Sequence, residues 1–258
     1  MNEEMHQVIA VARMAASLIL SNGGETYRAE EPAVHIGRTF GFDIDVIALP
    51  TGLTMTVRHG EESATSIARV SSRTTDLARL ERVNAISRAL ESRDMALDEA
   101  RRELERLSRP AAARVGLSAA AGGGSAAMFA LMFLGDGFDM LAAGLISAAV
   151  QAVLCFLPDQ EGMPLTCLIG GFLVAALSLA VVLLCGMGDA DRIILSNMMP
   201  LLPGLAFTNA IRDSMHGDMV SGGARICDAV MRAVILATGA GIAMLAFLRI
   251  GGGNAWWM

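Results

Sequence analysis

Five apolar stretches follow Arg114, and each is long enough to cross a lipid bilayer as a helix. Such a helix needs about 20 mostly apolar residues, because the hydrocarbon core is about 30 Å thick. The stretches lie at about 115–135, 140–158, 164–187, 193–211 and 229–248. They predict an α-helical membrane protein with five transmembrane helices. Glycines recur within them, which favours a bundle of closely packed helices; they are Gly122, Gly123, Gly124, Gly170, Gly171, Gly239 and Gly241.

The residues before the first stretch have a different composition. Residues 1–114 contain 15 of the 20 arginines and 17 of the 26 acidic residues. Periodicity and turn residues there predict helices and strands in the order helix, helix, hairpin, strand, helix, helix. These elements lie at about 5–20, 25–39, 43–49 with 53–57, 66–70, 76–90 and 95–107. We therefore expect a small cytoplasmic α+β domain over residues 1–109 and a five-helix transmembrane domain over residues 110–258.

The placement of arginine predicts the orientation in the membrane. Five arginines lie between Arg101 and Arg114, whereas the loop at 135–139 has none. Cytoplasmic flanks of membrane helices are rich in arginine, and the acidic start of the sequence is unlike a secretory signal. We expect a multi-pass protein of the inner (cytoplasmic) membrane, with the N-terminal domain in the cytoplasm and the tail at 256–257, Trp-Trp, on the outer side.

Composition excludes several classes of function. The chain contains no lysine, so it lacks the ammonium group that a Walker A loop, a Schiff-base enzyme or a protein kinase requires. A net charge of -6 with 5% aromatic residues argues against a nucleic-acid partner. The cysteines and histidines are scattered, without the spacing of metal ligands or of a nucleophile with its base. We therefore predict no metal and no catalytic residue.

The fourth apolar stretch is interrupted in its middle. Pro200 and Pro203, followed by Gly204, remove two backbone donors and release carbonyl groups that lipid cannot satisfy. Broken helices at membrane depth commonly form substrate sites in transporters. The interruption is therefore expected to lie among neighbouring helices beside a hydrated pocket. A proline kink that serves only helix packing is an equal alternative.

Two polar clusters lie elsewhere in the sequence. Glu25, Thr26 and Arg28, together with Tyr27, Glu30 and Glu31, gather acids, a hydroxyl and an arginine within one and a half turns. Such a cluster suits a polar solute or acid–base chemistry, although helix starts are often charged in this way. The second cluster follows the broken stretch, and its members are Asn209, Arg212, Asp213, Asp218 and Asp228. Asp228 lies four residues before Arg232, so the two are expected to pair. The alternative is that Arg232 snorkels to the cytoplasmic surface.

An ordered set of short segments runs through most of the chain. Its members are 21–30 (SNGGETYRAE), 49–52 (LPTG), 73–77 (RTTDL), 83–84 (VN), 200–204 (PLLPG), 209–213 (NAIRD), 217–218 (GD) and 221–222 (SG). The set resembles the threonine/serine exporter family (ThrE, YjjP). One departure is Gly24, where the family's usual GAET signature has alanine.

The resemblance implies an inner-membrane exporter of small polar metabolites without a bound cofactor. Threonine and serine are the solutes of some members, and a dicarboxylate such as succinate is the solute of others. Fused members carry more spans, so five spans imply the larger subunit of a split exporter whose partner is a small YjjB-like membrane protein.

On this interpretation the broken span and the cluster after it hold the solute. The residues expected to bind it are Pro200, Pro203, Gly204, Asn209 and Arg212, and Arg212 is chosen because its fork fits a carboxylate. The candidates for proton coupling are Asp213, Asp218 and Asp228. A membrane-anchored hydrolase or sensor, with its activity in the cytoplasmic domain, is the alternative function. A third possibility is a structural subunit whose partner holds the site.

Overall fold

The computed structural model describes residues 3–71, 74–109, 115–157 and 164–250. The chain divides into two compact units. The first unit comprises Met1–Ala111 and Leu205–Cys227, and the second comprises Ala112–Gly204 and Asp228–Met258. Residues 205–227 therefore belong with the N-terminal part, a grouping that the order of residues along the chain does not suggest. Arg73 and the Trp256–Trp257 tail lie outside the described residues.

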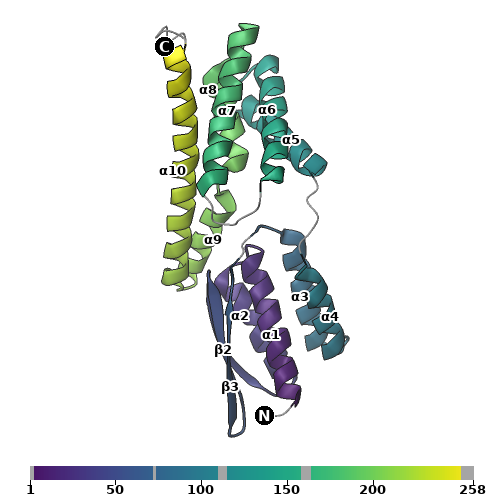
Figure 1. The fold of residues 1–258 in the computed structure, drawn as a ribbon. Helices are drawn as coiled ribbons and strands as arrows, with labels where there is room; N and C mark the ends of the chain where they lie inside the picture. The colour runs from purple at the N-terminus through teal and green to yellow at the C-terminus, as the bar shows by residue number, and fades with distance from the viewer. Residues whose placement is uncertain (1–2, 72–73, 110–114, 158–163, 251–258) are drawn as a thin grey trace. The chain divides into compact units, whose positions relative to one another are not determined.

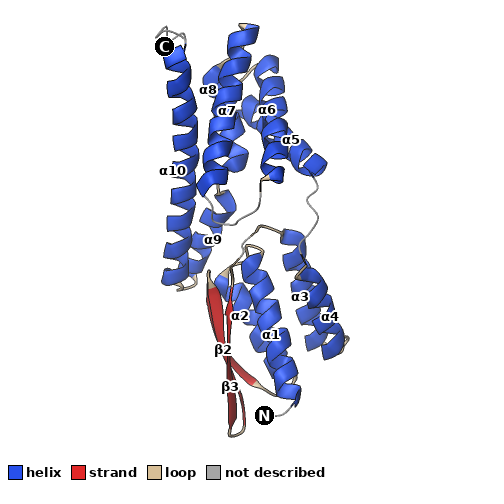
Figure 2. Cartoon of the chain, viewed as in Figure 1, coloured by secondary structure: helices blue, strands red, loops and turns tan. Residues whose placement is uncertain are grey.

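The first unit begins with two helices and a small sheet (Figures 1 and 2). Helix α1 spans Glu3–Ser21 and α2 spans Thr26–Thr39. The strands β1 (Asp43–Leu49), β2 (Gly52–His59) and β3 (Glu62–Arg69) form an antiparallel sheet in the order β1-β2-β3. The pairing of Leu49 with Gly52 leaves Pro50 and Thr51 as the turn, as the sequence predicts.

Two further helices complete the N-terminal part of this unit. Helix α3 spans Leu77–Glu91, and the side chain of Asp76 caps it by accepting a hydrogen bond from the N–H of Arg79 at 3.0 Å. Helix α4 spans Leu97–Leu107. The predicted helices and hairpin of this region are therefore confirmed, and the further strand is longer than expected.

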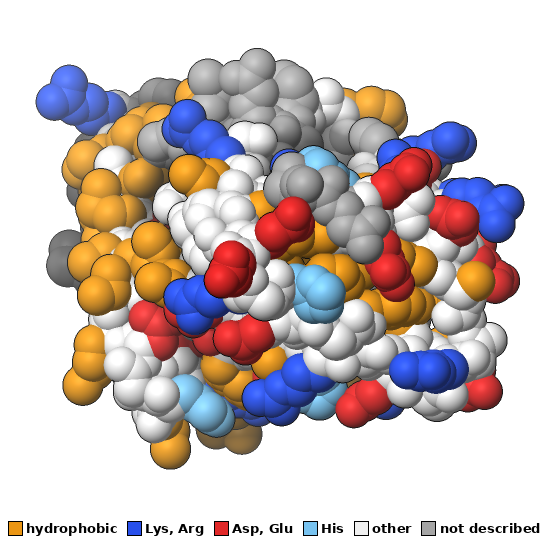
Figure 3. Space-filling model, turned by 90° about the horizontal axis from the view of Figure 1, so that it is seen from below, with side chains coloured by type: hydrophobic (Ala, Val, Ile, Leu, Met, Phe, Trp, Pro, Cys, Tyr) orange, Lys and Arg blue, Asp and Glu red, His pale blue; other side chains and the backbone are white. Residues whose placement is uncertain are grey.

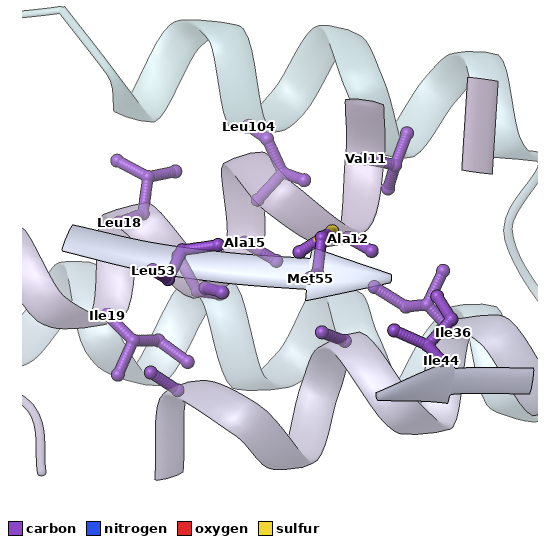
Figure 4. Close-up of a cluster of buried hydrophobic side chains, with 14 of the residues drawn as sticks. Val11, Ala12, Ala15, Leu18, Ile19, Ile36, Ile44, Leu53, Met55 and Leu104 are labelled. Carbon is purple, nitrogen blue, oxygen red and sulfur yellow. The ribbon is translucent and has the colours of Figure 1, made fainter. Parts of the chain in front are cut away.

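The core of the first unit is built around α1. Its apolar stripe packs against α2, α3, α4 and the sheet. Figure 4 labels part of this core, with side chains from α1, α2, α4, β1 and β2. Ala12 and Ala15 let the neighbouring elements approach, while Ile19, Met55 and Leu104 fill the space between them and are almost completely buried. Seen from below, the surface carries acidic, basic and histidine side chains interspersed with apolar ones (Figure 3). This unit has the buried core of a protein domain surrounded by water.

All the regular secondary structure in the described residues of the second unit is helical. It contains α5 (Val115–Met132), α6 (Gly137–Phe156), α7 (Pro164–Cys185), α8 (Ala190–Met198), the 3₁₀ turn η1 (Met199–Leu201) and most of α10 (Met219–Ile250). Four helices, α5, α6, α7 and α10, are long and apolar enough to cross a membrane. A fifth span is counted if the bent pair at 190–215 is one span. Five spans were predicted, and the structure supports four or five. The last helix begins at Met219, earlier than the expected start near residue 229.

Glycine allows close contact between the helices of the second unit. A Cβ atom at Gly239 of α10 would overlap the carbonyl oxygen of Leu168 on α7, and one at Gly171 would overlap that of Leu236. A Cβ at Gly123 of α5 would lie 2.7 Å from the carbonyl oxygen of Gly144 on α6. These positions confirm the predicted role of glycine in packing. Gly124 and Gly241, in contrast, face open space within the described structure.

Two turns of the second unit are joined by a buried carboxylate. Asp139 is 1% exposed. Its oxygens accept hydrogen bonds from the N–H of Asp136 at 3.3 Å and of Asp189 at 2.9 Å. Arg192 Nη1 donates to the carbonyl of Leu134 at 2.9 Å. The α5–α6 turn is therefore fastened to the α7–α8 turn by polar contacts.

The interruption after α8 is present. Helix α8 is followed by η1 and then by α9 (Gly204–Met215), and the two apolar segments meet at an angle of 51°. Pro200 and Pro203 are partly buried, whereas Leu202 and Gly204 are exposed in the isolated chain. The prolines therefore break the helix, as their missing N–H groups predict.

Candidate functional site

The turn between α1 and α2 is the starting point of the site. Gly23 has a φ of +84°, a left-handed conformation that glycine adopts without strain. Glu25 is the N-cap residue of α2, but its side chain makes no capping hydrogen bond to the helix. Arg212 Nη1 lies 2.8 Å from Glu25 Oε1, and Arg28 Nη1 lies 3.4 Å from Oε2. One buried carboxylate is therefore held between two guanidinium groups.

These neighbours set the charge of Glu25. Burial raises the pKa of this carboxyl, but the hydrogen bond from Arg212, a backbone hydrogen bond and the charges of Arg28 and Arg212 together lower it. The net result is a pKa below the ordinary value of 4.5. Glu25 is therefore an anion at neutral pH.

Asp213 of α9 provides a second, fully buried carboxylate. Its Oδ1 accepts hydrogen bonds from the backbone N–H of Thr26 at 3.0 Å and from the Thr26 hydroxyl at 2.9 Å. Its Oδ2 lies 2.9 Å from Nε of Arg225, whose side chain is 11% exposed. Thr26 is the first residue of α2, so an aspartate almost 190 positions away supplies the carboxylate at this helix start.

The carbonyl groups of the glycine turn are also bound by residues 205–227. Asn209 Nδ2 donates to the carbonyl of Gly23 at 2.6 Å, and Arg225 Nη2 donates to that of Gly24 at 2.7 Å. The α9–α10 hairpin can hold both donors because Gly222 has no side chain. A Cβ there would overlap Ser214 Oγ and lie 2.7 Å from the carbonyl oxygen of Ala210.

An aromatic pair lies beside the ion pair. The rings of Tyr27 and His216 are stacked, with centroids 3.9 Å apart and planes at 7°. His216 Nδ1 lies 2.9 Å from the carbonyl oxygen of Arg212, so Nδ1 carries the proton that is donated. Burial and the charge of Glu25 raise the pKa of Tyr27. The tyrosine is therefore neutral and forms a flat wall beside the charged groups.

Two more carboxylates complete the cluster. Burial raises the pKa of Asp218, but hydrogen bonds involving Thr26 and Ser221 and the charge of Arg225 lower it below its ordinary value. Glu30 Oε1 accepts a hydrogen bond from the N–H of Ala48 at 2.9 Å. Glu30 is partly buried, and its pKa is raised by burial and by the charges of neighbouring aspartates.

The structure brings together most of the residues predicted to be functional. Glu25, Thr26 and Arg28 form one connected cluster with the residues of the other predicted set, Asn209, Arg212, Asp213 and Asp218. Pro200, Pro203, Gly204 and Asp228 belong to the second unit. Within it, Asp228 Oδ2 lies 3.1 Å from Arg232 Nε, so the predicted local pair is formed.

Two residues of the cluster, His216 and Arg225, were not predicted as site residues. Tyr27 and Glu30 were recognised only as members of the charged helix start. Arg225 is one of only five arginines after residue 114. That scarcity is the signal that could have identified Arg225. Among the described residues, no three His, Cys, Asp or Glu side chains are placed to share a metal ion.

Comparison with known proteins assigns the chain to a family. The model of the ThrE family, described as "Putative threonine/serine exporter", matches residues 10–247. No curated protein and no solved structure matches the chain. The family match includes every residue of the cluster and nearly all of the apolar helices. The chain therefore belongs to the ThrE family of exporters and is a multi-pass membrane protein.

Proposed function

We propose that this chain is a subunit of a secondary active exporter that moves small polar solutes out of the cell across the inner membrane. Residues 1–109 lie in the cytoplasm in this proposal, because arginine is concentrated before the first span. A small YjjB-like membrane protein is the proposed partner. The family match and the four or five candidate spans support the transport role.

The ion pair between Glu25 and Arg212 carries the proposal. It places one anion and one cation 2.8 Å apart, and the Arg212 side chain is 54% exposed. An amino acid is a zwitterion, so its carboxylate can replace Glu25 on Arg212 while its ammonium group replaces Arg212 on Glu25. Such an exchange retains an ionic partner for every charge, which a buried carboxylate requires.

The same pair favours an amino acid over a dicarboxylate. Succinate could bind Arg212 through one carboxylate, but its second carboxylate would have no matching ammonium group and would meet the negative charge of Glu25. Threonine and serine are therefore the proposed solutes. Arg28 stabilises the second oxygen of Glu25, and Asn209, Thr26 and Asp213 hold the glycine turn in the position that presents Glu25.

The residues of the helix break and three aspartates are also proposed to take part in transport. Pro200, Pro203 and Gly204 form a bent break in an apolar segment, which is where a transporter helix can expose backbone carbonyl groups to a solute. Asp213, Asp218 and Asp228 remain the candidates for proton coupling.

Efflux from solute-loaded cells tests the proposal. Cells co-expressing the full chain and its small membrane partner are loaded with labelled threonine, serine or succinate. Arg212→Ala should reduce threonine and serine efflux about 10- to 100-fold, because a charge-assisted hydrogen bond to a carboxylate contributes about 1.5–3 kcal/mol. Arg212→Lys should recover only part of the loss, since an ammonium group lacks the guanidinium fork.

Arg102 provides the matched control. It is an exposed arginine of α4 whose Nε donates a hydrogen bond to the carbonyl of Asp98 on the same helix, so Arg102→Ala should leave efflux unchanged. Unchanged efflux in Arg212→Ala would refute the proposal that the Glu25–Arg212 pair binds the solute. Faster export of succinate than of threonine would refute the proposal that threonine and serine are the solutes.

A further inference from the structure

Among the described residues of the second unit, Asn197 of α8 is a fully buried side chain with one oxygen that lacks a hydrogen-bond donor. It is 0% exposed. Its Nδ2 donates to the carbonyl of Ile193 at 2.8 Å, but nothing in the described structure donates to its Oδ1. The hydroxyls of Ser178 and Ser196, also buried, each donate to a carbonyl of their own helix. An acceptor that is buried without a donor destabilises a fold, so Asn197 calls for an explanation other than packing.

Asn197 lies close to the break in the fourth apolar segment. It is the eighth residue of α8, about 12 Å along the helix axis from the helix start. Three residues later, Pro200 has no N–H to offer the carbonyl of Ser196, so a second acceptor has lost its usual helical donor. The 3₁₀ turn η1 follows at once, and turns of this kind have poorer hydrogen bonds and often mark hinges. The end of α8 therefore combines acceptor groups with a place where the helix can move.

Gln151 of α6 brings a second amide to the same bundle. A Cβ at Gly122 would lie 2.5 Å from Gln151 Cγ, so this side chain lies against α5. Its amide makes no hydrogen bond in the part of the chain that the structure describes. Ser147, one turn earlier on the same face of α6, is buried. The adjacent Val150 belongs to the same core cluster as Ile194 of α8, so polar groups border this core from two helices.

The donor for Asn197 has to come from a molecule that enters the bundle. Because the side chain is completely enclosed within the isolated chain, neither lipid nor the surface of a partner subunit reaches it. The side-chain oxygen of asparagine only accepts hydrogen bonds. Threonine and serine carry two kinds of donor, an ammonium group and a hydroxyl. Polar side chains within membrane segments commonly mark the path of a transported solute.

We propose that Asn197 is a solute-binding residue inside the membrane bundle, where its Oδ1 accepts a hydrogen bond from the ammonium or hydroxyl group of the amino acid in transit, and that Gln151 lines the same path. This inference rests on the proposed function and adds a position beyond the Glu25–Arg212 pair. The break at Pro200 lets α8 move to admit the solute. Asn197 destabilises the empty bundle, and the bound solute removes that cost.

Substitution by leucine tests this role, because a transport residue and a packing residue respond with opposite signs. Asn197→Leu keeps the approximate size of the side chain and removes the buried acceptor, and the carbonyl of Ile193 keeps the N–H of residue 197 as its helical donor. Efflux of threonine and serine, corrected for the amount of protein in the membrane, should fall at least about tenfold, the factor that one hydrogen bond to a charged donor contributes. The thermal unfolding midpoint of the purified full chain in detergent should stay the same or rise.

Two further variants accompany this one. Gln151→Leu should lower efflux in the same direction by a smaller factor. Ser178→Ala is the matched control, because that serine is equally buried but its hydroxyl is already bonded to its own helix, so efflux should not change. Unchanged efflux in Asn197→Leu would overturn the proposal, and it is the result expected if water inside the bundle satisfies Oδ1. Reduced efflux together with a lower midpoint would also overturn it, since that combination indicates a packing role.

Calorimetric titration of the purified full chain with L-threonine separates this inference from the proposed site. Asn197→Leu should bind threonine within about threefold of the wild type, because the first contact is made at the Glu25–Arg212 pair, whereas Arg212→Ala should weaken binding at least about tenfold. Binding that Arg212→Ala leaves unchanged would refute the proposed solute site. Binding lost in Asn197→Leu to the same extent as in Arg212→Ala would refute a separate position within the bundle.

Discussion

Large aliphatic side chains make up most of the buried core of the first unit, whereas more than half of the described core residues of the second unit are alanine and many of its large side chains face outward. Ile19, Leu90 and Leu104 are at most 1% exposed in the first unit. In the second, Ala126 and Ala143 are fully buried, while large side chains at the helix surfaces are exposed, among them Leu145 at 65% and Leu184 at 84%. Water drives large apolar groups inward, but lipid tails solvate leucine as well as a protein interior does.

The difference shows what holds each unit together. Burial of apolar surface stabilises the first unit, and it can therefore bear the cost of a buried charged network at Asp213 and Arg225. The second unit gains little from moving leucine out of lipid, so close backbone contact at positions such as Gly171 and Gly239 must supply the stabilisation. Substitutions of the two kinds should therefore destabilise the two units by different mechanisms.

The largest effect is expected from the buried ion pair of the first unit. Asp213→Ala leaves Arg225 and the Thr26 donors without their carboxylate, which should cost about 3–5 kcal/mol of unfolding free energy. Glu105→Ala breaks the exposed pair with Arg101, whose side chains are each about half exposed, and should cost at most about 0.5 kcal/mol. Denaturant unfolding of the purified full chain, followed by circular dichroism, measures both. Equal losses in the two variants would show that the network at Asp213 is not stabilising.

A smaller effect is expected from one methyl group in the second unit. Gly239→Ala places a Cβ against the carbonyl oxygen of Leu168 and should cost about 1–3 kcal/mol, the usual range for overpacking. Gly241→Ala is its control, because that glycine lies two residues away on the same helix and faces open space. Thermal unfolding midpoints in detergent should fall for the first variant only. A midpoint for Gly239→Ala at or above that of Gly241→Ala would contradict the close-contact explanation.

The smallest effect is expected in the dependence of stability on pH, and it concerns the first unit, which contains Glu25. Because the pKa of Glu25 in the folded state lies below its ordinary value of 4.5, its contribution to stability is present above about pH 4.5 and is lost as pH falls through the folded-state pKa. Glu25→Gln should therefore weaken the acid sensitivity of the first unit. Unfolding monitored at Tyr27 over a pH series measures this, and an unchanged acid limb would contradict the assigned pKa direction.

The elements of this fold could be predicted because their signals are local. The stripe of α1, the turn at Pro50 and the cap at Asp76 each specify a few neighbouring residues. The break after α8 was predicted for the same reason, since a proline removes its own N–H. The start of α10 was missed because Arg225 and Asp228 interrupt the apolar run that the counting of windows requires.

The assembly of the site could not be predicted in the same way. Glu25 and Arg212 were each recognised as polar residues of interest, but they are separated by 187 positions, and a single sequence contains no signal that pairs them. The glycine turn at Gly23 and Gly24 has a local signature, whereas its donors, Asn209 and Arg225, lie on another segment. Tertiary contact alone makes one cluster out of the two motifs.

The stacked pair at the edge of the cluster gives the site a built-in spectroscopic label. Tyr27 is the only tyrosine of the chain, and its ring lies flat on that of His216 beside the Glu25–Arg212 pair. Fluorotyrosine incorporated during growth would therefore yield a single fluorine NMR resonance. Its chemical shift depends on the ring stacked against it, so solute or proton binding could be followed at this position in the otherwise unmodified protein.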